Sequence, residues 1–195
     1  MKRYAAMLLC LAALLLCGCA AEQTDARAEK LQQKYAAMDG YAATVELTTA
    51  ERDESTRYRL DVKREGEETH VTVLEPEAIA GVSAVVSGDA LSLTYDGMAL
   101  AAGGAATELN AVNGTAAVLR AAAEGFITEQ NTERYGDTDA LRLCLETELN
   151  GETLYVTAYF DANDAPLYAE IERDGWVMQY LEFTNFAFGD IVESE

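Results

Sequence analysis

Three of the four cysteines lie near the start of the chain, in a run of small and apolar residues. The run follows the basic pair Lys2 and Arg3 and ends in the tetrad Leu16-Cys17-Gly18-Cys19. The chemistry that cysteine offers is nucleophilic, because its thiolate attacks electrophilic carbon. Cys19, at the end of the tetrad, is therefore the first candidate for a covalent modification.

The segment before Cys19 has the pattern of a bacterial secretory signal, with a basic start, an apolar core and an exit of small residues. As a helix, the core at residues 5–16 would be about 18 Å long at about 1.5 Å per residue. That is shorter than the roughly 30 Å hydrocarbon core of a bilayer. Residues 4–21 together would be a marginal span, so an uncleaved anchor is the alternative interpretation.

The tetrad resembles the lipobox of bacterial lipoproteins, although Cys17 is unusual in its second place. The resemblance implies transfer of a diacylglyceryl group to the Cys19 thiol and cleavage before it, whereas ordinary cleavage would release the protein. We expect residues 1–18 to be a lipoprotein signal peptide and residues 19–24 a lipidated tether. Two or more acyl chains hold a protein stably on a membrane, so the predicted location is the extracytoplasmic face of the bacterial cell membrane.

The remaining residues, 25–195, have the length of a single domain that can bury a core. The formal net charge of −20 becomes −22 once Lys2 and Arg3 leave with the signal. Such a surface repels nucleic acid and favours basic partners, although the same charge also serves plain solubility. Cys144 is the cysteine left in the domain, so we expect no intramolecular disulfide and read Cys144 as a strand residue.

Few residues of the domain have the types and spacing that catalysis needs. His70 is the only histidine, no Gly-x-Ser-x-Gly occurs and no cysteine is spare, which argues against a hydrolase triad. Residues 161–164 have some features of a calcium loop but lack the later Gly and the bidentate Glu, so a turn is favoured. The sequence predicts no catalytic residue, no metal site and no cofactor.

The pattern of apolar residues predicts two helices and many strands. One helix is expected from Thr24 or Asp25 to about Met38, and a second at residues 115–124, capped by Asn113 or Thr115. Residues 41–73 alternate with period two, as in three hairpin-linked antiparallel strands. Pro76 then interrupts the sheet, and two strands follow at residues 82–87 and 91–95.

Residues 98–112 are rich in Ala and Gly and predict either a slack connection or a mobile flap. The last third of the chain again alternates, with a polar edge strand at residues 127–135 and a hairpin turn at Asn150-Gly151. About nine or ten strands and two helices must share one core. The predicted fold class is therefore α+β, a curled antiparallel sheet covered by two helices.

This order of elements resembles the LolA/LolB-like superfamily, in particular the lipid-anchored LolA-like envelope lipoproteins, which include outer-membrane-lipoprotein-sorting-like proteins and the germination lipoprotein GerS. The local matches are residues 38–43, Pro76 with residues 79–81, and residues 159–161 with 166–168. The resemblance implies a half-open β-barrel whose hollow receives acyl chains or, in the germination protein, a fold that acts through an envelope amidase. It implies no catalytic residue. The anchor at Cys19 departs from soluble carriers and favours a membrane-fixed protein.

Two apolar surfaces are candidates for binding. The first is an inward set, interpreted either as ordinary core or as the lining of a ligand-binding hollow: Leu47, Leu60, Val62, Val73, Leu143, Leu145, Val156 and Phe160. The second is an aromatic set on the opposite face, interpreted either as a partner-binding patch or as cross-strand pairs: Tyr155, Tyr159, Tyr168, Trp176 and Tyr180.

The sequence thus leads to two functional hypotheses. The first is a non-enzymatic, membrane-anchored bacterial envelope lipoprotein that binds a hydrophobic ligand or a lipoprotein acyl chain in its hollow. The alternative is a protein–protein interaction module that binds and regulates a basic envelope enzyme, such as a cell-wall amidase, through the aromatic face and the negative charge. Nucleic acid is not an expected partner of either.

Overall fold

The computed structural model describes residues 24, 26–51, 54–87, 90–100 and 109–189. The predicted signal peptide, Cys19 and the tether up to residue 23 lie outside the described residues, as does most of the expected flap, residues 101–108. Within the described part, no helix is long and apolar enough to cross a membrane.

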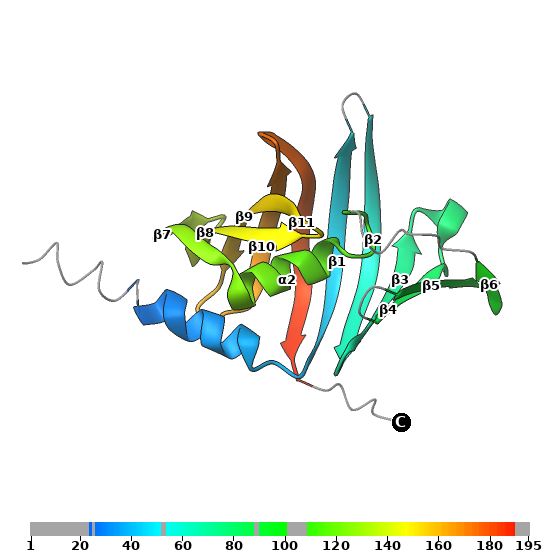
Figure 1. Ribbon diagram of the computed structural model, residues 1–195, viewed down its shortest axis with the longest axis horizontal. Helices are drawn as coiled ribbons and strands as arrows, with labels where there is room; N and C mark the ends of the chain where they lie inside the picture. Colours follow the sequence, from blue (N-terminus) through cyan, green and yellow to red (C-terminus); the bar gives the residue numbers. More distant parts are fainter. Residues whose placement is uncertain (1–23, 25, 52–53, 88–89, 101–108, 190–195) are drawn as a thin grey trace, which may run out of the picture.

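All the described strands form one antiparallel sheet in the order β6-β5-β4-β3-β2-β1-β11-β10-β9-β8-β7, as Figure 1 shows. Neighbours in this order are also neighbours in sequence, except that β1 pairs with β11 and joins the two halves of the chain. Strands β6 and β7 are the two ends of this order and do not pair with each other. The sheet is therefore open, not closed into a barrel. The bounds are β1 Gly40–Glu51, β2 Glu54–Glu65, β3 Glu68–Glu75, β4 Ser83–Ser87, β5 Ala90–Tyr95, β6 Met98–Leu100, β7 Phe126–Tyr135, β8 Thr138–Leu149, β9 Glu152–Phe160, β10 Pro166–Arg173 and β11 Trp176–Phe188.

The helices also follow the predicted pattern, with local corrections. The N-terminal helix is described at residue 24 and over residues 26–36, and α2 covers Gly114–Glu124. A short 3-10 helix, η1, at Glu77–Ile79 follows Pro76 where the sheet is interrupted. Asn113 occupies the N-cap position of α2, as one of the two predicted alternatives, but its side chain makes no capping bond, and its Oδ1 accepts the main-chain N–H of Asn110 at 2.8 Å.

The α+β class, the curled antiparallel sheet and the two covering helices are therefore confirmed. The described strands number eleven, whereas the sequence predicts nine or ten. The unexpected one is β6, whose three residues pair with β5 across the Asp96-Gly97 turn, in the region that was expected to be a loop.

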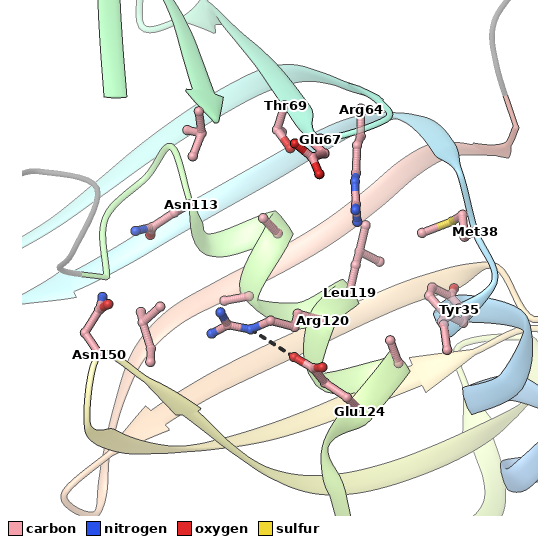
Figure 2. A pocket seen from close by; sticks show the side chains of 16 residues that line it. Tyr35, Met38, Arg64, Glu67, Thr69, Asn113, Leu119, Arg120, Glu124 and Asn150 are labelled. Atoms are coloured by element: carbon pink, nitrogen blue, oxygen red, sulfur yellow. Dashed lines mark ion pairs between the residues drawn. The ribbon is translucent and has the colours of Figure 1, made fainter. Parts of the chain in front are cut away.

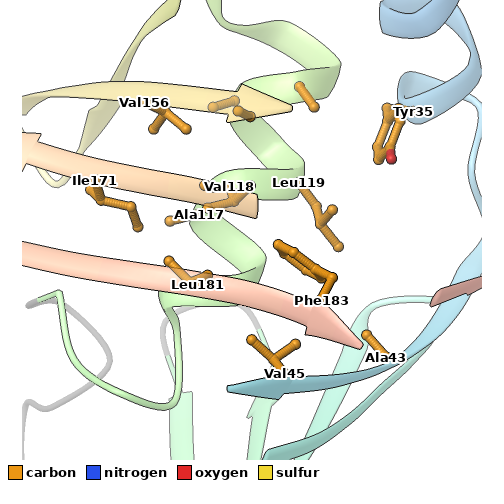
Figure 3. Close-up of a cluster of buried hydrophobic side chains, with 14 of the residues drawn as sticks. Tyr35, Ala43, Val45, Ala117, Val118, Leu119, Val156, Ile171, Leu181 and Phe183 are labelled. Atoms are coloured by element: carbon orange, nitrogen blue, oxygen red, sulfur yellow. The ribbon is translucent and has the colours of Figure 1, made fainter. Parts of the chain in front are cut away.

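The core lies between α2 and the concave face of strands β8 to β11 and β1 (Figures 1 and 3). Alternate residues of each strand point to this face, which is why apolar side chains at period two can fill it. Val118 of α2 is fully buried with Val156, Ile171 and Leu181 beneath it. Among the described residues, the buried hydrophobic side chains run from Ala28 to Phe183, so a chain that begins after Cys19 keeps all of these.

Candidate ligand-binding cavity

A cavity of about 470 Å³ opens beside this core, where the end of the N-terminal helix, α2, the β2–β3 hairpin, β4 and the β8–β9 turn approach one another (Figure 2). Its walls come from segments that are far apart in sequence. The lining residues are Tyr35, Ala36, Met38, Arg64, Glu67, Thr69, Val86, Asn113, Ala116, Ala117, Leu119, Arg120, Ala123, Glu124, Leu149 and Asn150.

Three of the six α2 residues that line the cavity are alanines, which leaves space beside the helix. Ala116 and Ala123 are half-buried, and Leu119 between them is 3% exposed. Methyl side chains leave space that a longer side chain would fill. Met38 and Leu149 add apolar surface from opposite sides. One wall of the cavity is therefore apolar and shallow.

Arg64 and Thr69 line the opposite wall, and they belong to a row of polar residues that crosses three strands. In the pairing register, Tyr41 of β1 lies opposite Arg64 of β2, and Arg64 lies opposite Thr69 of β3. Tyr41 and Thr69 are buried, at 1% and 7% exposure, and Arg64 is half-buried. The neighbouring row, Val62 and Val71, is entirely apolar. The apolar core thus ends at the cavity in a strip of hydrogen-bonding groups.

Tyr41 is the most buried member of this strip. Burial raises the pKa of its hydroxyl to about 12, and the nearby Arg64 guanidinium and Thr69 hydroxyl partly offset that rise. Among the described residues, the Tyr41 hydroxyl has no hydrogen-bond partner of ordinary geometry. Arg64 donates from Nε to the main-chain O of Gly66 at 2.9 Å, and its side chain extends toward the cavity in Figure 2.

Two carboxylates and a second guanidinium complete the rim. Arg120 of α2 lies with Nε 3.7 Å from Oε1 of Glu124 and donates from a terminal nitrogen to the main-chain O of Glu148 at 2.9 Å. Glu67 lies in the β2–β3 turn and is exposed, as is Glu124. An exposed ion pair of this kind contributes about 0–1 kcal/mol. Hydration by water therefore stabilises the two carboxylates about as well as the contact with Arg120 does.

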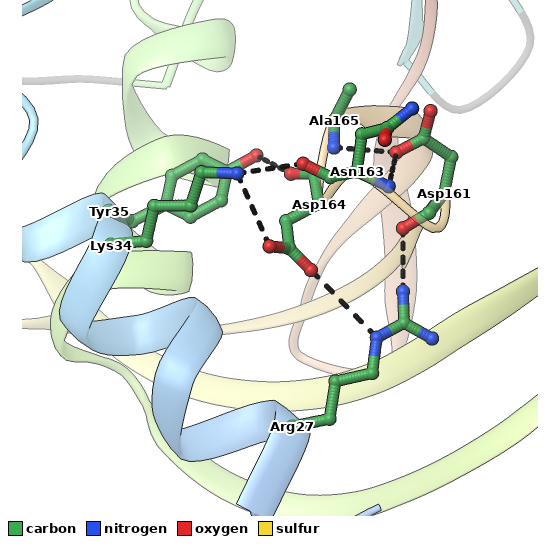
Figure 4. A network of polar contacts seen from close by, with 7 residues as sticks. All are labelled: Arg27, Lys34, Tyr35, Asp161, Asn163, Asp164 and Ala165. Atoms are coloured by element: carbon green, nitrogen blue, oxygen red, sulfur yellow. Dashed lines mark hydrogen bonds and ion pairs between the residues drawn. The ribbon is translucent and has the colours of Figure 1, made fainter.

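The N-terminal helix is fixed to the β9–β10 turn by the polar network in Figure 4. Tyr35 donates its hydroxyl to the main-chain O of Asp164 at 2.7 Å, and Lys34 donates to the main-chain O of Asn163 at 2.7 Å. Asp161 shapes the turn, because its Oδ1 accepts the N–H groups of Asn163 and Ala165, each at 2.8 Å. Tyr35 therefore has its hydroxyl held in this network while its side chain forms part of the cavity wall.

The predicted turn at residues 161–164 is thus the docking point of a helix. No group of three or more His, Cys, Asp or Glu side chains that could hold a metal ion occurs among the described residues. His70 is exposed on β3, with Nε2 3.6 Å from a Glu68 carboxylate oxygen. Cys144 is half-buried on the convex face of β8, within 3.7 Å of the Thr157 hydroxyl.

The inward set predicted for ligand binding lies in the core, beside the cavity and not in its wall. Seven of the eight side chains are at most 1% exposed, and Val73 is half-buried and packs against them. None of the eight lines the 470 Å³ cavity. Their role in ligand binding stays a prediction, and the members are Leu47, Leu60, Val62, Val73, Leu143, Leu145, Val156 and Phe160.

The aromatic set is only partly brought together. Tyr159 and Tyr168 lie opposite each other on β9 and β10, with ring centroids 6.0 Å apart. Tyr180 lies near them on β11 and is 37% exposed. Tyr155 and Trp176 are exposed, and neither makes a ring contact with this pair among the described aromatic residues. Their role in partner binding also stays a prediction.

Two further residues were not predicted from the sequence, Tyr135 in the aromatic group and Arg64 at the cavity. Tyr135 of β7 completes the aromatic group, with its ring 5.2 Å from that of Tyr159 and 5.6 Å from that of Tyr168. Arg64 had a visible signal, since it continues the period-two series of Leu60 and Val62 on the inward face of β2. An arginine at an inward-facing position indicates that the apolar core borders a polar cavity at this point of the strand.

No protein-family model matches the chain, and no curated protein matches its sequence. Solved structures do match it. A LolA superfamily protein from Nitrosomonas europaea is 14% identical with a TM-score of 0.44, over 87% of this chain and 95% of the other. An outer membrane lipoprotein-sorting protein domain from Vibrio parahaemolyticus is 10% identical with a TM-score of 0.38, over 88% and 93%.

Lipoprotein LppX from Mycobacterium tuberculosis is 13% identical with a TM-score of 0.45, over 86% of this chain and 97% of the other. These similarities concern the arrangement of the chain and carry no function with them. The architecture that the sequence predicts is confirmed by the structure itself: an open, curled antiparallel sheet covered by two helices.

Proposed function

We propose that this chain is a non-enzymatic envelope lipoprotein that binds a hydrophobic ligand, such as an acyl chain, beneath its two helices. The observation that carries the proposal is the 470 Å³ cavity. Its size falls in the range of about 300–1,000 Å³ that small-molecule pockets occupy, and such pockets combine apolar walls with a few polar groups. The alanines and Leu119 of α2 supply apolar wall, and Arg64 and Thr69 supply polar groups.

The side chains beneath α2 are a second part of the proposal. An acyl chain longer than the cavity would reach Val156 only if α2 moved away from the sheet, because Val156 is buried beneath that helix. A fatty acid with a photoreactive diazirine at the end of its chain tests this. Labelling of β8 or β9 would place the predicted set in the deep lining, and labelling confined to α2 would remove it from the site.

The main test asks whether the domain carries lipid. Residues 20–195 include every buried hydrophobic residue of the described part of the chain. This domain would be purified from a bacterial host, and its lipid extract would be analysed by mass spectrometry. Ala116→Trp and Ala123→Trp fill the cavity from α2. Each should lower the amount of bound lipid at least about tenfold, which corresponds to about 1.4 kcal/mol of binding free energy.

The matched control is Ala187→Trp, since Ala187 is an exposed residue of β11 that does not line the cavity. This variant should carry as much lipid as the parent. A parent domain that carries no lipid and binds no added fatty acid would contradict the proposal. Equal lipid in all three tryptophan variants would place any bound lipid outside this cavity.

Lipidation of Cys19 is the other part of the proposed function, and it rests on the lipobox resemblance of residues 16–19. The full chain would be expressed in bacteria supplied with an alkyne-tagged palmitate. The parent chain should take up the label and sediment with membranes, whereas Cys19→Ser should do neither. An unlabelled parent chain in the soluble fraction would contradict lipidation.

A second candidate function is favoured by the group of Tyr135, Tyr159 and Tyr168 on the convex face. Their rings lie within 6.0 Å of one another. Tyrosines are common at contact surfaces because each presents a large rigid area with a polar tip. Carboxylates surround them, since Tyr168 donates its hydroxyl to Glu170 at 2.7 Å and lies opposite Glu182. A basic protein partner would complement this surface.

The interaction hypothesis is tested with a lysine-rich peptide and heteronuclear NMR. Binding that perturbs β7, β9 and β10 and is weakened by Tyr159→Ala and Tyr168→Ala would favour it. Tyr95→Ala is the matched control, because Tyr95 is an exposed tyrosine of β5 on the other half of the sheet. Perturbations spread evenly over the acidic surface would count against a specific site.

A further inference from the structure

We infer that the cavity takes an amphiphile with an anionic head, a carboxylate or a phosphate, and that Arg64 holds this head at the polar strip. The inference rests on the proposed function, because it assigns the ligand class of the same cavity. Its starting point is the placement of charge. The chain has 34 acidic and 14 basic residues, yet two of its guanidinium groups, those of Arg64 and Arg120, line this one cavity.

Arg64 is placed to receive an anion. The guanidinium carries five N–H donors in a planar fork, and the hydrogen bond to the main-chain O of Gly66 uses the one on Nε. The side chain is half-buried and extends into the cavity between the β2–β3 hairpin and α2 (Figure 2). Partial burial lowers the effective dielectric constant, which strengthens the attraction between a guanidinium and a bound anion.

One neighbour of Arg64 supplies a further donor for the same head. Thr69 lies opposite it on β3, is buried and lines the cavity. Tyr41 lies opposite it on β1 and is buried, but it does not line the cavity, so Thr69 is the neighbouring hydroxyl that a ligand head can reach. A buried hydroxyl gains from a hydrogen bond that an oxygen-bearing ligand can accept.

Arg120 faces the cavity from α2, but its charge is partly engaged. Its Nε lies 3.7 Å from Glu124, whose side chain is 67% exposed. Glu67 on the hairpin is exposed as well. Both carboxylates can therefore turn into solvent when a ligand anion arrives, and Arg120 serves as a secondary contact. The tail of the amphiphile would lie along Ala116, Leu119 and Met38, on the apolar side.

The test uses calorimetric titration of residues 20–195 with amphiphiles that share one acyl chain. Laurate and lauroyl lysophosphatidate carry anionic heads, and monolaurin carries a neutral head. We expect the anionic amphiphiles to bind about tenfold or more tightly than monolaurin, since hydrogen bonds to charged groups are the stronger class. Arg64→Gln should remove most of this difference and leave monolaurin binding within about twofold of the parent.

Arg134→Gln is the matched control, because Arg134 is an exposed arginine in the strand at the far edge of the sheet and does not line the cavity. It should keep the preference for anionic heads. Arg120→Gln should reduce the preference less than Arg64→Gln does. Should Arg64→Gln unfold the domain, Arg64→Lys retains the charge and should keep part of the preference.

The outcomes distinguish a failure of the anionic-head inference from a failure of the proposed function. Monolaurin binding as tightly as laurate would overturn the anionic head and leave the proposed cavity function in place. No binding of any amphiphile would overturn both. Inorganic phosphate or acetate that binds as tightly as the amphiphiles would show an anion site without a tail, and would overturn the assignment of an amphiphile.

Discussion

The hydroxyl of Tyr35 donates a hydrogen bond of 2.7 Å to the main-chain O of Asp164, a residue 129 positions further along the chain. This contact joins the end of the N-terminal helix to the β9–β10 turn. Asp164 also attracts two cations of the same helix, with Lys34 Nζ at 3.2 Å and Arg27 Nε at 3.8 Å. The helix that forms one wall of the cavity is therefore tied to a turn on the other half of the molecule, in addition to the hydrogen bond from Gln32 to the main-chain O of Gly125 at 2.8 Å.

Replacing Tyr35 by Phe should lower the free energy of unfolding by about 0.5–1.5 kcal/mol, the usual net worth of such a hydrogen bond. The ring would remain, because it packs edge-on against Phe160 with centroids 5.6 Å apart. Urea unfolding followed by circular dichroism measures the loss. Tyr155→Phe, at an exposed tyrosine, should change nothing, and an equal loss in both variants would contradict this reading.

Replacing Asp164 by Asn should weaken the same attachment through charge alone. Asp164 has φ of 66°, a conformation that Asn tolerates almost as well as Asp. Because the paired side chains are one quarter to two fifths exposed, the loss of stability should stay at or below about 1 kcal/mol. Unfolding measured in about 1 M salt, where the Debye length is about 3 Å, should show almost no difference between the two proteins. A loss of stability that is the same at high salt would indicate that Asp164→Asn changes the conformation of the β9–β10 turn. It would count against an effect of the ion pairs with Lys34 and Arg27.

Gly114 begins α2 at a place where a side chain has no room. A Cβ at this position would collide with the side-chain oxygen of Gln179 and lie 3.1 Å from Cδ1 of Leu47. Both neighbours are buried. Gly114→Ala should therefore destabilise the domain by about 1–3 kcal/mol through overpacking, although alanine is the better helix former by about 1 kcal/mol.

The cause can be checked by a double-mutant cycle with Gln179→Ala, which removes the colliding oxygen. The double variant should be more stable than the sum of the two single losses predicts, by about 0.5–3 kcal/mol of coupling. Strict additivity would show that the glycine is required for a reason other than this contact.

Alkaline pH should destabilise the domain through its buried tyrosines. Burial raises the pKa of Tyr41 to about 12 and raises the pKa of Tyr35 as well, with Asp164 adding to the effect on Tyr35. A free tyrosine ionises near pH 10. Above that pH the unfolded chain loses the phenol proton while the folded chain keeps it, so stability falls as pH rises. It is unaffected by these groups below about pH 9.

The expected slope is about 1.4 kcal/mol per pH unit for each buried tyrosine, from about pH 10 to the folded pKa. Urea unfolding at pH 8, 10 and 11 measures it. Tyr41→Phe should remove one tyrosine's share of the slope and cost little at pH 8, because its hydroxyl has no partner of ordinary geometry in the described residues. An unchanged alkaline slope in Tyr41→Phe would contradict the assignment.

The local elements of this protein could be predicted from the sequence because their causes are local. Period-two alternation assigns side chains to the two faces of a strand, and Asn150-Gly151 or Asp174-Gly175 reverses the chain in place. The antiparallel order, the break at Pro76 and the edge position of residues 126–135 follow from such signals. The short strand β6 was not predicted, because three residues are too few to show a period of two.

The site could not be predicted in the same way. The alternation of apolar and polar residues shows on which face of the sheet a side chain lies, but not which element packs on that face. Val156 faces inward as expected, yet α2 lies over it and makes it part of the core. Arg64 and Thr69 also face inward, yet they border a cavity. Which inward residues are covered depends on where two short helices dock.

The sequence by itself determined the acidic surface, the predicted anchor at Cys19, the antiparallel strands and the two amphipathic helices, because each is a property of neighbouring residues. Only the tertiary structure decided that β1 pairs with β11, that Tyr35 is tied to Asp164, and that Tyr135 joins Tyr159 and Tyr168. These contacts join residues that are distant in sequence, and they form only when the curled sheet brings its strands and helices together.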